Sequence, residues 1–234
     1  FNFEKKYFEK ENVSCEFVGH PLLEEKENLK INIDQFLEKD KRIISVFSGS
    51  RISEIKILAP ILIDFIKLMN IRYDDINYVF HSTNDNKKLI QKYLSDSKLK
   101  NCGVISDDKI KTHILQKSIF AVSKSGTISL EICNFKIPSI IIYKMNFINF
   151  LIIKSLINTK FANIINIAAN EEIIPELLQS NCNAKNIFNF ANSYLETPSK
   201  MNNQIKKVEN VLNTFKTKYS SAELASTALN KFLL

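Results

Sequence analysis

The chain has 234 residues, of which 45% are hydrophobic and 24% are charged, and its formal net charge is +7. This is ordinary globular composition, long enough to bury a substantial core in one large domain or slightly more. The positive charge suits an anionic partner, but the lysines are scattered and form no stripe interleaved with aromatic residues, so the sequence argues against nucleic-acid binding.

Cysteine and histidine spacing argues against a metal centre. The four cysteines and three histidines lie far apart, with no C-x-x-C pair and no histidine at ligand spacing from a cysteine. We therefore expect reduced, mostly buried thiols and no bound metal. The longest apolar stretch, 147–157, is interrupted by Asn149 and Lys154 and is shorter than the roughly 20 residues that span a bilayer.

The first 20 residues mix charged residues with a short apolar run at 15–18 and end at Gly19-His20-Pro21. Proline forces its predecessor out of helix, so this tripeptide is typical of a joint between domains. The chain begins with Phe1 rather than Met, and it shows no secretory signal. We expect it to be the C-terminal part of a longer protein, with 1–20 as the end of the preceding domain.

The first clear strand is predicted at 41–47, where an apolar run stops at Ser48-Gly49-Ser50-Arg51. Ser53 and Glu54 then open an amphipathic helix that runs to about Met69, and Pro60 should kink or restart it. Strand and helix patterns alternate from here on. Further strands are expected at 77–80, 103–105, 119–122 and 138–143.

This alternation predicts a Rossmann-like parallel sheet with right-handed crossovers, flanked by helices. The remaining elements are predicted as an apolar helix around 146–157, an extended run at 162–166, a helix near 173–179, and three amphipathic helices within 184–234. The breaks between these last helices fall at Thr197-Pro198 and near 219–221. We place the Rossmann-like domain at 21–198 and the C-terminal helices at 199–234.

Two strand ends carry small residues suited to binding an anion. Gly49, Ser50 and Arg51 stand at a strand-to-helix turn, where free N–H groups attract phosphate and a guanidinium can contact its oxygens in pairs. The spacing is not that of a Walker A loop. A simple tight turn with a surface arginine is the alternative for this motif alone.

Ser125-Gly126-Thr127 repeats the arrangement on a later strand, within Ser123–Glu131. Glu131 lies four residues after Thr127, on the same helix face, so its carboxylate could meet the hydroxyls of a ribose. The alternative is a helix cap followed by a solvated glutamate.

Two further segments have weaker signals. His20 is either part of a rigid joint or a neutral hydrogen-bond donor to phosphate or sugar at a domain cleft. Tyr143-Lys144-Met145 closes the last strand at the same sheet edge, where Lys144 could help to neutralise a diphosphate. A solvated lysine is the simpler interpretation.

Taken in order, these segments resemble the C-terminal half of the lipid-A-disaccharide synthases, UDP-sugar glycosyltransferases with the two-domain GT-B fold. The matching pieces are Phe17–Leu22, Gly49–Arg51 with Glu54-Ile55, Ser125–Thr127 with Leu130-Glu131, Pro138, Tyr143–Met145, Lys154, Asn166 and Pro175–Gln179. The match covers most of residues 1–180. No single motif is decisive, but the ordered set is specific.

The resemblance implies transfer of 2,3-diacylglucosamine from its UDP derivative to 2,3-diacylglucosamine 1-phosphate (lipid X), which yields lipid A disaccharide and UDP. It also implies a donor site in which Gly49–Arg51 hold the diphosphate, Ser125–Thr127 flank it, Glu131 takes the ribose and the strand end at Ile105-Ser106 meets the uracil. Tyr143, Lys144, Met145, Asn166 and His20 would be further substrate contacts. Arg51 would stabilise the leaving group, and no cofactor or metal is implied.

Partners and location also follow from the resemblance. The acceptor site and the catalytic acid or base would lie in the chain's own N-terminal domain, onto which 199–234 would pack. The enzyme would act at the cytoplasmic face of the bacterial inner membrane, as a peripheral protein, and a homodimer stays open.

Some residues depart from the family pattern. Phe47-Ser48 replaces the usual Leu-Pro before Gly-Ser-Arg, and Ile164-Ile165-Asn166 replaces Leu-Pro-Asn, which weakens the assignment of Asn166. Two alternatives stay open: another GT-B enzyme that uses UDP-GlcNAc, either the peptidoglycan GlcNAc transferase or an epimerase, and a non-enzymatic nucleotide-binding α/β module. The Gly-Ser-Arg and Tyr-Lys-Met segments favour the synthase.

Overall fold

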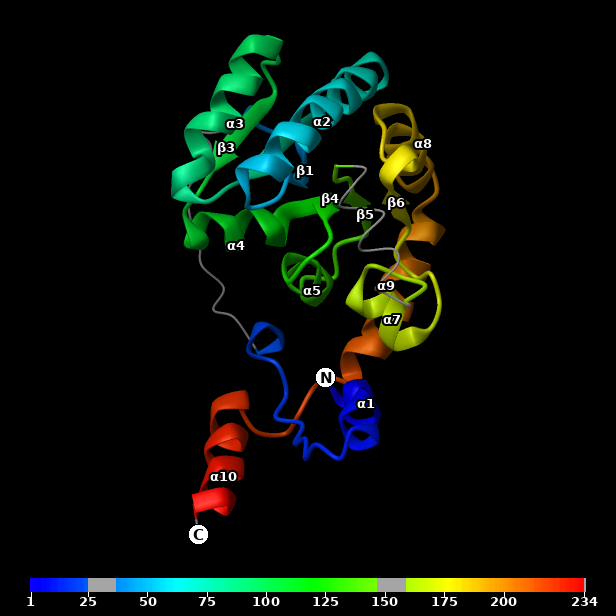
Figure 1. Ribbon diagram of the computed structural model, residues 1–234. Coiled ribbons are helices and arrows are strands. Elements are labelled where there is room, and N and C mark those ends of the chain that lie inside the picture. Colours follow the sequence, from blue (N-terminus) through cyan, green and yellow to red (C-terminus); the bar gives the residue numbers. More distant parts are fainter. Residues whose placement is uncertain (25–36, 147–158, 234) are drawn as a thin grey trace.

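The computed structural model describes residues 1–24, 37–146 and 159–233 (Figure 1). Its strands are β1 (Arg42–Phe47), β2 (Ile76–His81), β3 (Cys102–Ile105), β4 (Ser118–Lys124), β5 (Ser139–Tyr143) and β6 (Glu176–Leu178). Its α-helices are α1 (Lys5–Lys10), α2 (Ile52–Arg72), α3 (Asn84–Ser97), α4 (Asp108–Lys117), α5 (Ile128–Asn134), α7 (Ile164–Ala169), α8 (Ala184–Glu196), α9 (Pro198–Asn213) and α10 (Ser221–Leu233). Short 3₁₀ helices lie at η1 (Asn2–Glu4), η2 (Pro21–Leu23) and η3 (Gln179–Asn181).

The six strands form one parallel sheet in the order β3-β2-β1-β4-β5-β6, which confirms the Rossmann-like prediction. The strand order reverses between β1 and β4, because β2 and β3 lie on one side of β1 while β4, β5 and β6 follow on the other. In open sheets of this kind, ligands bind beyond the carboxyl ends of the strands at that reversal. The topology therefore points to the ends of β1 and β4.

Both faces of the sheet are covered by helices, which is why its central strands β1, β2 and β4 are largely apolar and buried. Ile44, Val46, Tyr78 and Phe80 pack under α2, α3 and α8 in the largest hydrophobic cluster. On the other face, α4 and α5 cover the centre of the sheet, and α7 and α9 pack at the β5–β6 end. Figure 1 shows these two helical layers on either side of the strands.

Several elements differ from the sequence predictions. Pro60 does not restart its helix, since α2 runs through it as one element, with the proline on the exposed face. The expected extended run at 162–166 is wrong, because the Asn163 side chain accepts a hydrogen bond from Ile165 N and caps α7. The expected helix near 173–179 is also wrong, since strand β6 forms there against β5. The helix expected around 146–157 falls almost entirely outside the described residues.

Helices α1 and α10, near the two ends of the chain, both lie below the sheet in the view of Figure 1. Ser221 donates hydrogen bonds from its backbone N and its hydroxyl to Glu24, which joins the start of α10 to the N-terminal segment. Gly19, at φ +80°, lies against Thr217, whose Oγ1 would be 2.7 Å from a Cβ at that position. The predicted breaks before α9 and α10 are confirmed.

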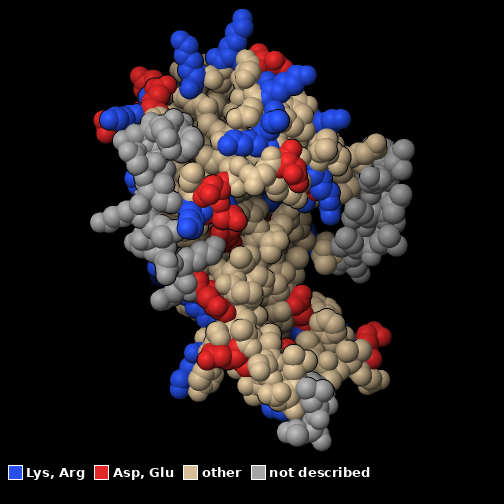
Figure 2. All heavy atoms as spheres, turned by 90° about the vertical axis from the view of Figure 1, so that its left-hand side faces the viewer, with Lys and Arg blue, Asp and Glu red and all other residues tan. Residues whose placement is uncertain are grey.

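Charges of both signs are interspersed over the face in Figure 2, with lysine and arginine more frequent in its upper part. Within the ranges that the structure describes, no helix combines the length and the apolar character needed to cross a bilayer.

Candidate functional site

A cavity of about 390 Å³ opens at the strand-order reversal, between the carboxyl ends of β1 and β4. It joins the two turns that the sequence singled out. Its lining residues are Phe47, Gly49, Ser50, Arg51, Glu54, His81, Ser82, Thr83, Asp108, Lys111, Lys124, Ser125, Gly126, Thr127 and Ile128. Of the predicted substrate contacts, six line this cavity: Gly49, Ser50, Arg51, Ser125, Gly126 and Thr127.

The turn after β1 requires a glycine. Gly49 has φ +99°, which side chains rarely permit, and a Cβ there would lie 2.4 Å from Oε2 of Glu54. The next two residues face outward, and the Arg51 side chain is 79% exposed. The turn therefore exposes the guanidinium of Arg51 to solvent, while the carboxylate of Glu54 is packed beneath it.

That carboxylate fills the anion position at the start of α2. Glu54 Oε2 accepts hydrogen bonds from the backbone N–H groups of Ser50 (3.1 Å) and Arg51 (3.4 Å). Its Oε1 lies 3.1 Å from Lys124 Nζ and 3.5 Å from Arg51 Nη1. Burial raises the pKa of Glu54, but Lys124 and the two N–H groups outweigh burial and hold that pKa below its usual value.

The turn after β4 forms the opposite wall. Ser125 Oγ donates a hydrogen bond of 2.7 Å to the carbonyl of Ala162, which anchors the turn to the chain before α7. A Cβ on Gly126 would meet no atom within 4 Å, so this residue borders open space. Thr127 is exposed at the start of α5. Lys124, the last residue of β4, lies with its Nζ 5.2 Å from the centre of the Tyr143 ring.

Glu131 is buried beside the cavity rather than lining it. Its side chain is only 4% exposed, and Oε2 lies 3.3 Å from Nζ of Lys111, which does line the cavity. Lys111 also pairs with Asp108 at 2.9 Å. Burial lowers the pKa of Lys111, but its hydrogen bond to Asp108 and the charge of Glu131 outweigh burial and raise that pKa.

His81 closes the inner end of the cavity. It is 6% exposed, stacks on Phe47 with ring centres 4.2 Å apart, and has Nε2 within 2.9 Å of Ser45 Oγ. Burial, with a smaller contribution from the charge of Lys111, lowers the pKa of His81 to about 3. The ring is therefore neutral at ordinary pH.

The other predicted contacts lie away from the cavity wall. Ile105 is buried at the end of β3, where its carbonyl accepts a hydrogen bond from Ser82 N, and Ser106 follows it half-buried. Lys144 Nζ donates to the Cys182 carbonyl at 3.4 Å, and Met145 N donates to Gln179.

His20 and Asn166 have structural partners. His20 Nδ1 accepts a hydrogen bond from Leu22 N and caps η2, and its ring stacks on Phe1. Burial lowers the pKa of His20, so the ring favours the neutral form that this hydrogen bond requires. Asn166 is fully buried, and its amide makes four hydrogen bonds within the segment that joins α7 to β6.

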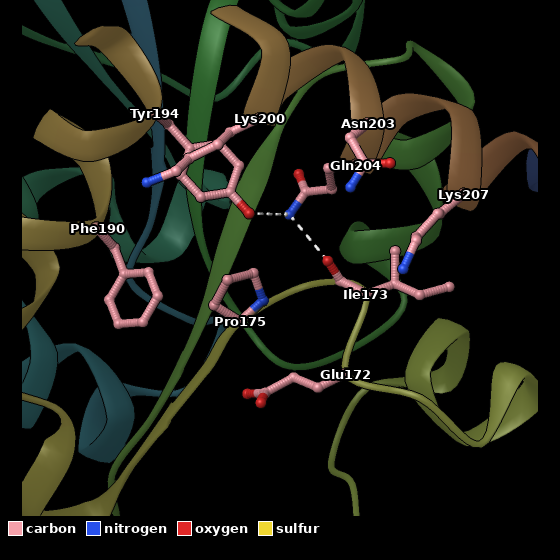
Figure 3. Close-up of a pocket in the computed structure, with 9 residues that line it drawn as sticks. All are labelled: Glu172, Ile173, Pro175, Phe190, Tyr194, Lys200, Asn203, Gln204 and Lys207. Atoms are coloured by element: carbon pink, nitrogen blue, oxygen red, sulfur yellow. Dashed lines mark hydrogen bonds between the residues drawn. The ribbon is translucent and has the colours of Figure 1, made fainter. Parts of the chain in front are cut away.

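A second cavity, of about 240 Å³, lies at the amino ends of β5 and β6 (Figure 3). Gln204 projects from α9 between its walls, donating to Tyr194 Oη at 3.2 Å and to the Ile173 carbonyl at 3.3 Å. The same amide also pairs with both backbone groups of Ser139. Gln204 therefore joins α8 and α9 to the sheet. This cavity lies at the amino ends of the strands, opposite the carboxyl ends at which the first cavity opens.

Sequence reasoning missed four residues of the site as participants: Glu54, His81, Lys111 and Lys124. Glu54 lies three residues after the N-cap Arg51 and accepts a hydrogen bond from its backbone N–H, which is the glutamate half of a capping box and a recognisable signal. Lys124 directly precedes the Ser-Gly-Thr turn. No local pattern marks His81 or Lys111, because only the order of the strands brings them to the cavity. Over the ranges with described positions, no three His, Cys, Asp or Glu side chains gather as metal ligands could.

The family model and the curated relatives agree on one family. The family model described as lipid-A-disaccharide synthetase matches residues 1–231. The lipid-A-disaccharide synthase of Rickettsia prowazekii is 33% identical over 213 residues, which cover 90% of this chain and 56% of that protein. The corresponding enzyme of Persephonella marina is 32% identical, over 90% of this chain and 59% of its own length. The chain thus spans less than two thirds of these relatives.

Solved structures with similar folds are much more distant in sequence. The S. aureus MnaA–UDP co-structure superposes with a TM-score of 0.58 at 16% identity, over 88% of this chain and 49% of that one. The Neisseria meningitidis UDP-GlcNAc 2-epimerase bound to UDP-GlcNAc gives 0.55 at 16% identity, over 83% and 46%. The C-terminal domain of a glycosyl transferase group 1 family protein from Francisella tularensis gives 0.51 at 14% identity, over 80% and 89%. These likenesses establish the fold as that of a GT-B C-terminal domain.

Proposed function

The chain belongs to the lipid-A-disaccharide synthase family, and we propose that it forms the donor-binding half of such a glycosyltransferase. The complete enzyme would transfer 2,3-diacylglucosamine from UDP to lipid X, with lipid A disaccharide and UDP as products. The observation that carries this proposal is the cavity at the strand-order reversal, where the Gly49 turn and the Ser125–Thr127 turn face each other.

The cavity offers what a nucleoside diphosphate needs. Backbone N–H groups at the start of α2 and the exposed fork of Arg51 suit diphosphate oxygens. Ser125, Gly126 and Thr127 supply a small, polar opposite wall. UDP-bound structures of similar fold support a UDP-sugar as the donor.

The nucleoside would extend from the diphosphate toward β2 and β3. In this arrangement the ribose hydroxyls approach Glu131, which Lys111 holds at the edge of the cavity. The uracil then lies near the strand end at Ile105-Ser106. Tyr143, Lys144, Met145 and His20 would contribute from outside the cavity wall, Tyr143 through its contact with Lys124. The amide of Asn166 is fully used in internal hydrogen bonds, so its part would be to hold the neighbouring chain.

The chemistry of this half is leaving-group stabilisation. Breaking the bond between the sugar and the diphosphate leaves additional negative charge on UDP. Arg51 and the N–H dipoles of the turn would meet that charge, and electrostatic stabilisation of this kind is usually the largest contribution to catalysis. The catalytic acid or base and the acceptor site would come from the upstream domain, of which 1–20 would be the end and onto which the helices of 199–234 would pack.

Location and assembly follow from the lipid substrates. The enzyme would act peripherally at the cytoplasmic face of the inner membrane, where both acylated sugars reside, and it could form a homodimer. A membrane-flotation assay and a sedimentation measurement on the complete protein test these two points.

The proposed reaction is tested on the chain joined to its upstream domain. UDP-2,3-diacylglucosamine and lipid X should give disaccharide and UDP, and Arg51→Ala should reduce the rate at least a hundredfold, as loss of one transition-state donor does. Absence of product from the complete enzyme would overturn the assignment. Conversion of UDP-GlcNAc without any lipid acceptor would favour the epimerase alternative instead.

A further inference from the structure

The Glu54 carboxylate occupies the position in which a donor phosphate would be expected. One of its oxygens accepts hydrogen bonds from both backbone N–H groups of the turn, and the other lies near Lys124 and Arg51. These are two backbone donors and two cations converging on one anion. Such a set of partners is what a phosphate oxygen requires at a helix N-terminus.

The surroundings of Lys124 also place its ammonium group where it can bind an anion. Its side chain is only 20% exposed, and Nζ lies between the Glu54 carboxylate at 3.1 Å and the face of the Tyr143 ring. It stands at the end of β4, on the cavity wall opposite the Gly49 turn. A cation at this place can reach a ligand that bridges the two turns.

The charges around the cavity balance without a ligand. Arg51 and Lys124 share Glu54, while Lys111 lies between Asp108 and Glu131. An entering diphosphate would therefore meet cations that already have carboxylate partners. Its attraction to Lys124 and Arg51 becomes available only if Glu54 gives them up, since two anions at one position repel.

We propose that Glu54 is a built-in substitute for a phosphate group, and that the donor diphosphate displaces it and takes over Lys124 as a ligand. This inference rests on the proposed function and names the exchange by which its site is filled. Glu54 lies in the first turn of α2, where rotation of its side chain frees both N–H groups without moving the helix. Its depressed pKa means that the carboxylate is charged at neutral pH.

Titration calorimetry of UDP, inorganic pyrophosphate and uridine tests the exchange on the 234-residue chain. Glu54→Gln removes the competing charge and keeps the shape, so UDP and pyrophosphate should bind roughly fivefold more tightly or better. Lys124→Met should weaken both by about tenfold, the loss of one charge-assisted contact. Uridine, which lacks phosphate, should respond to neither substitution.

Matched controls separate the exchange from general charge effects. Asp64→Asn removes a carboxylate from the exposed face of the same helix, and it should leave all three affinities unchanged. Glu54→Ala checks that the gain does not depend on the glutamine amide, and thermal unfolding of each variant checks that it folds. In the Lys124→Met background, Glu54→Gln should give a smaller gain in UDP affinity, because Glu54 and the diphosphate compete in part for Lys124.

The outcomes distinguish the inference from the function. Weaker UDP binding by folded Glu54→Gln and Glu54→Ala would make Glu54 a positioning residue and overturn the exchange. Unchanged UDP binding by Lys124→Met would overturn Lys124 as a ligand. A third outcome is that pyrophosphate binds and its affinity changes as expected in the Glu54 and Lys124 variants, while UDP binds no more tightly than pyrophosphate. The exchange then stands, and the assignment of a nucleotide to the cavity fails. Absence of binding by either anion overturns both.

Discussion

Asn166 donates a hydrogen bond of 2.8 Å to Oε1 of Glu176, and this contact ties α7 to β6. The same glutamate accepts hydrogen bonds from the backbone N–H of Ala162 at 2.7 Å and of Asn163 at 2.9 Å. The Ala162 carbonyl in turn receives the hydroxyl of Ser125 at the cavity. A chain of hydrogen bonds therefore runs from the edge strand of the sheet to the turn after β4.

We predict that Asn166→Ala destabilises the protein by about 2–4 kcal/mol, because it removes the acceptor of the buried Ile174 N–H, one of the two acceptors of Ile173 N–H, and the donor to the Ile174 carbonyl. Urea denaturation measures this change. Asn202→Ala, at an exposed position on α9, should change the unfolding free energy by less than about 0.5 kcal/mol. Equal effects of the two substitutions would show that the buried amide network is not what holds this segment.

Gly49→Ala should lower the unfolding free energy by about 1–3 kcal/mol. The new Cβ would be 2.4 Å from Oε2 and 2.8 Å from Cβ of Glu54, on a backbone at φ +99°. Thermal unfolding provides the measurement, with Ser53→Ala in the exposed first turn of α2 as the control. An alanine variant as stable as the parent would contradict the packing of the turn.

The buried His81 predicts a pH dependence of stability. Its pKa of about 3 in the folded protein lies below the usual 6.5, so between these values the unfolded chain binds a proton that the folded chain does not. Its contribution to unfolding free energy is therefore constant above pH 6.5 and is lost as pH falls, by about 1.4 kcal/mol at pH about 5.5.

Urea denaturation at pH about 7.5 and about 5.5 measures this loss, and His81→Gln should lose less stability over the same interval by that amount. A glutamine at this position can still bond to Ser45, so the variant isolates the titration. Identical pH profiles for the two proteins would mean that folding does not lower the pKa of His81.

Pro60→Ala should stabilise the protein by about 1–2 kcal/mol. The proline lies on the exposed face of α2, well inside the helix, and it lacks the N–H that would bond to the carbonyl four residues earlier. Alanine restores that backbone hydrogen bond, although it also raises the conformational entropy of the unfolded chain, which offsets part of the gain. Thermal unfolding measures the gain, and a lower midpoint than the parent's would contradict it.

Local sequence patterns predicted the centre of the sheet well. Strands β1, β2 and β4 are largely apolar runs bounded by turn residues, because both of their faces are buried. Strand β6 is only Glu176-Leu177-Leu178 and exists through pairing with β5. Its surroundings show helix-like spacing, so tertiary contacts rather than local preference decide its structure.

The site was predictable in part for the same reason. Gly49 and Gly126 follow strands in a chain that has four glycines, and their positions mark the two walls of the cavity. The pairing of Lys124 with Glu54 depends on β4 lying beside β1, across a strand-order reversal that no local pattern reveals. The four hydrogen bonds of Asn166 likewise depend on how α7 meets β6.

The central claim is that the cavity between β1 and β4 binds the nucleotide of the donor, with Arg51 as a diphosphate contact. Titration of UDP into the parent chain, Arg51→Ala and Arg72→Ala tests it, since Arg72 carries the same charge at the far end of α2. The account predicts that UDP binds to the parent and to Arg72→Ala with equal affinity, and at least about tenfold more weakly or not at all to Arg51→Ala. Equal UDP affinity for all three proteins would contradict it.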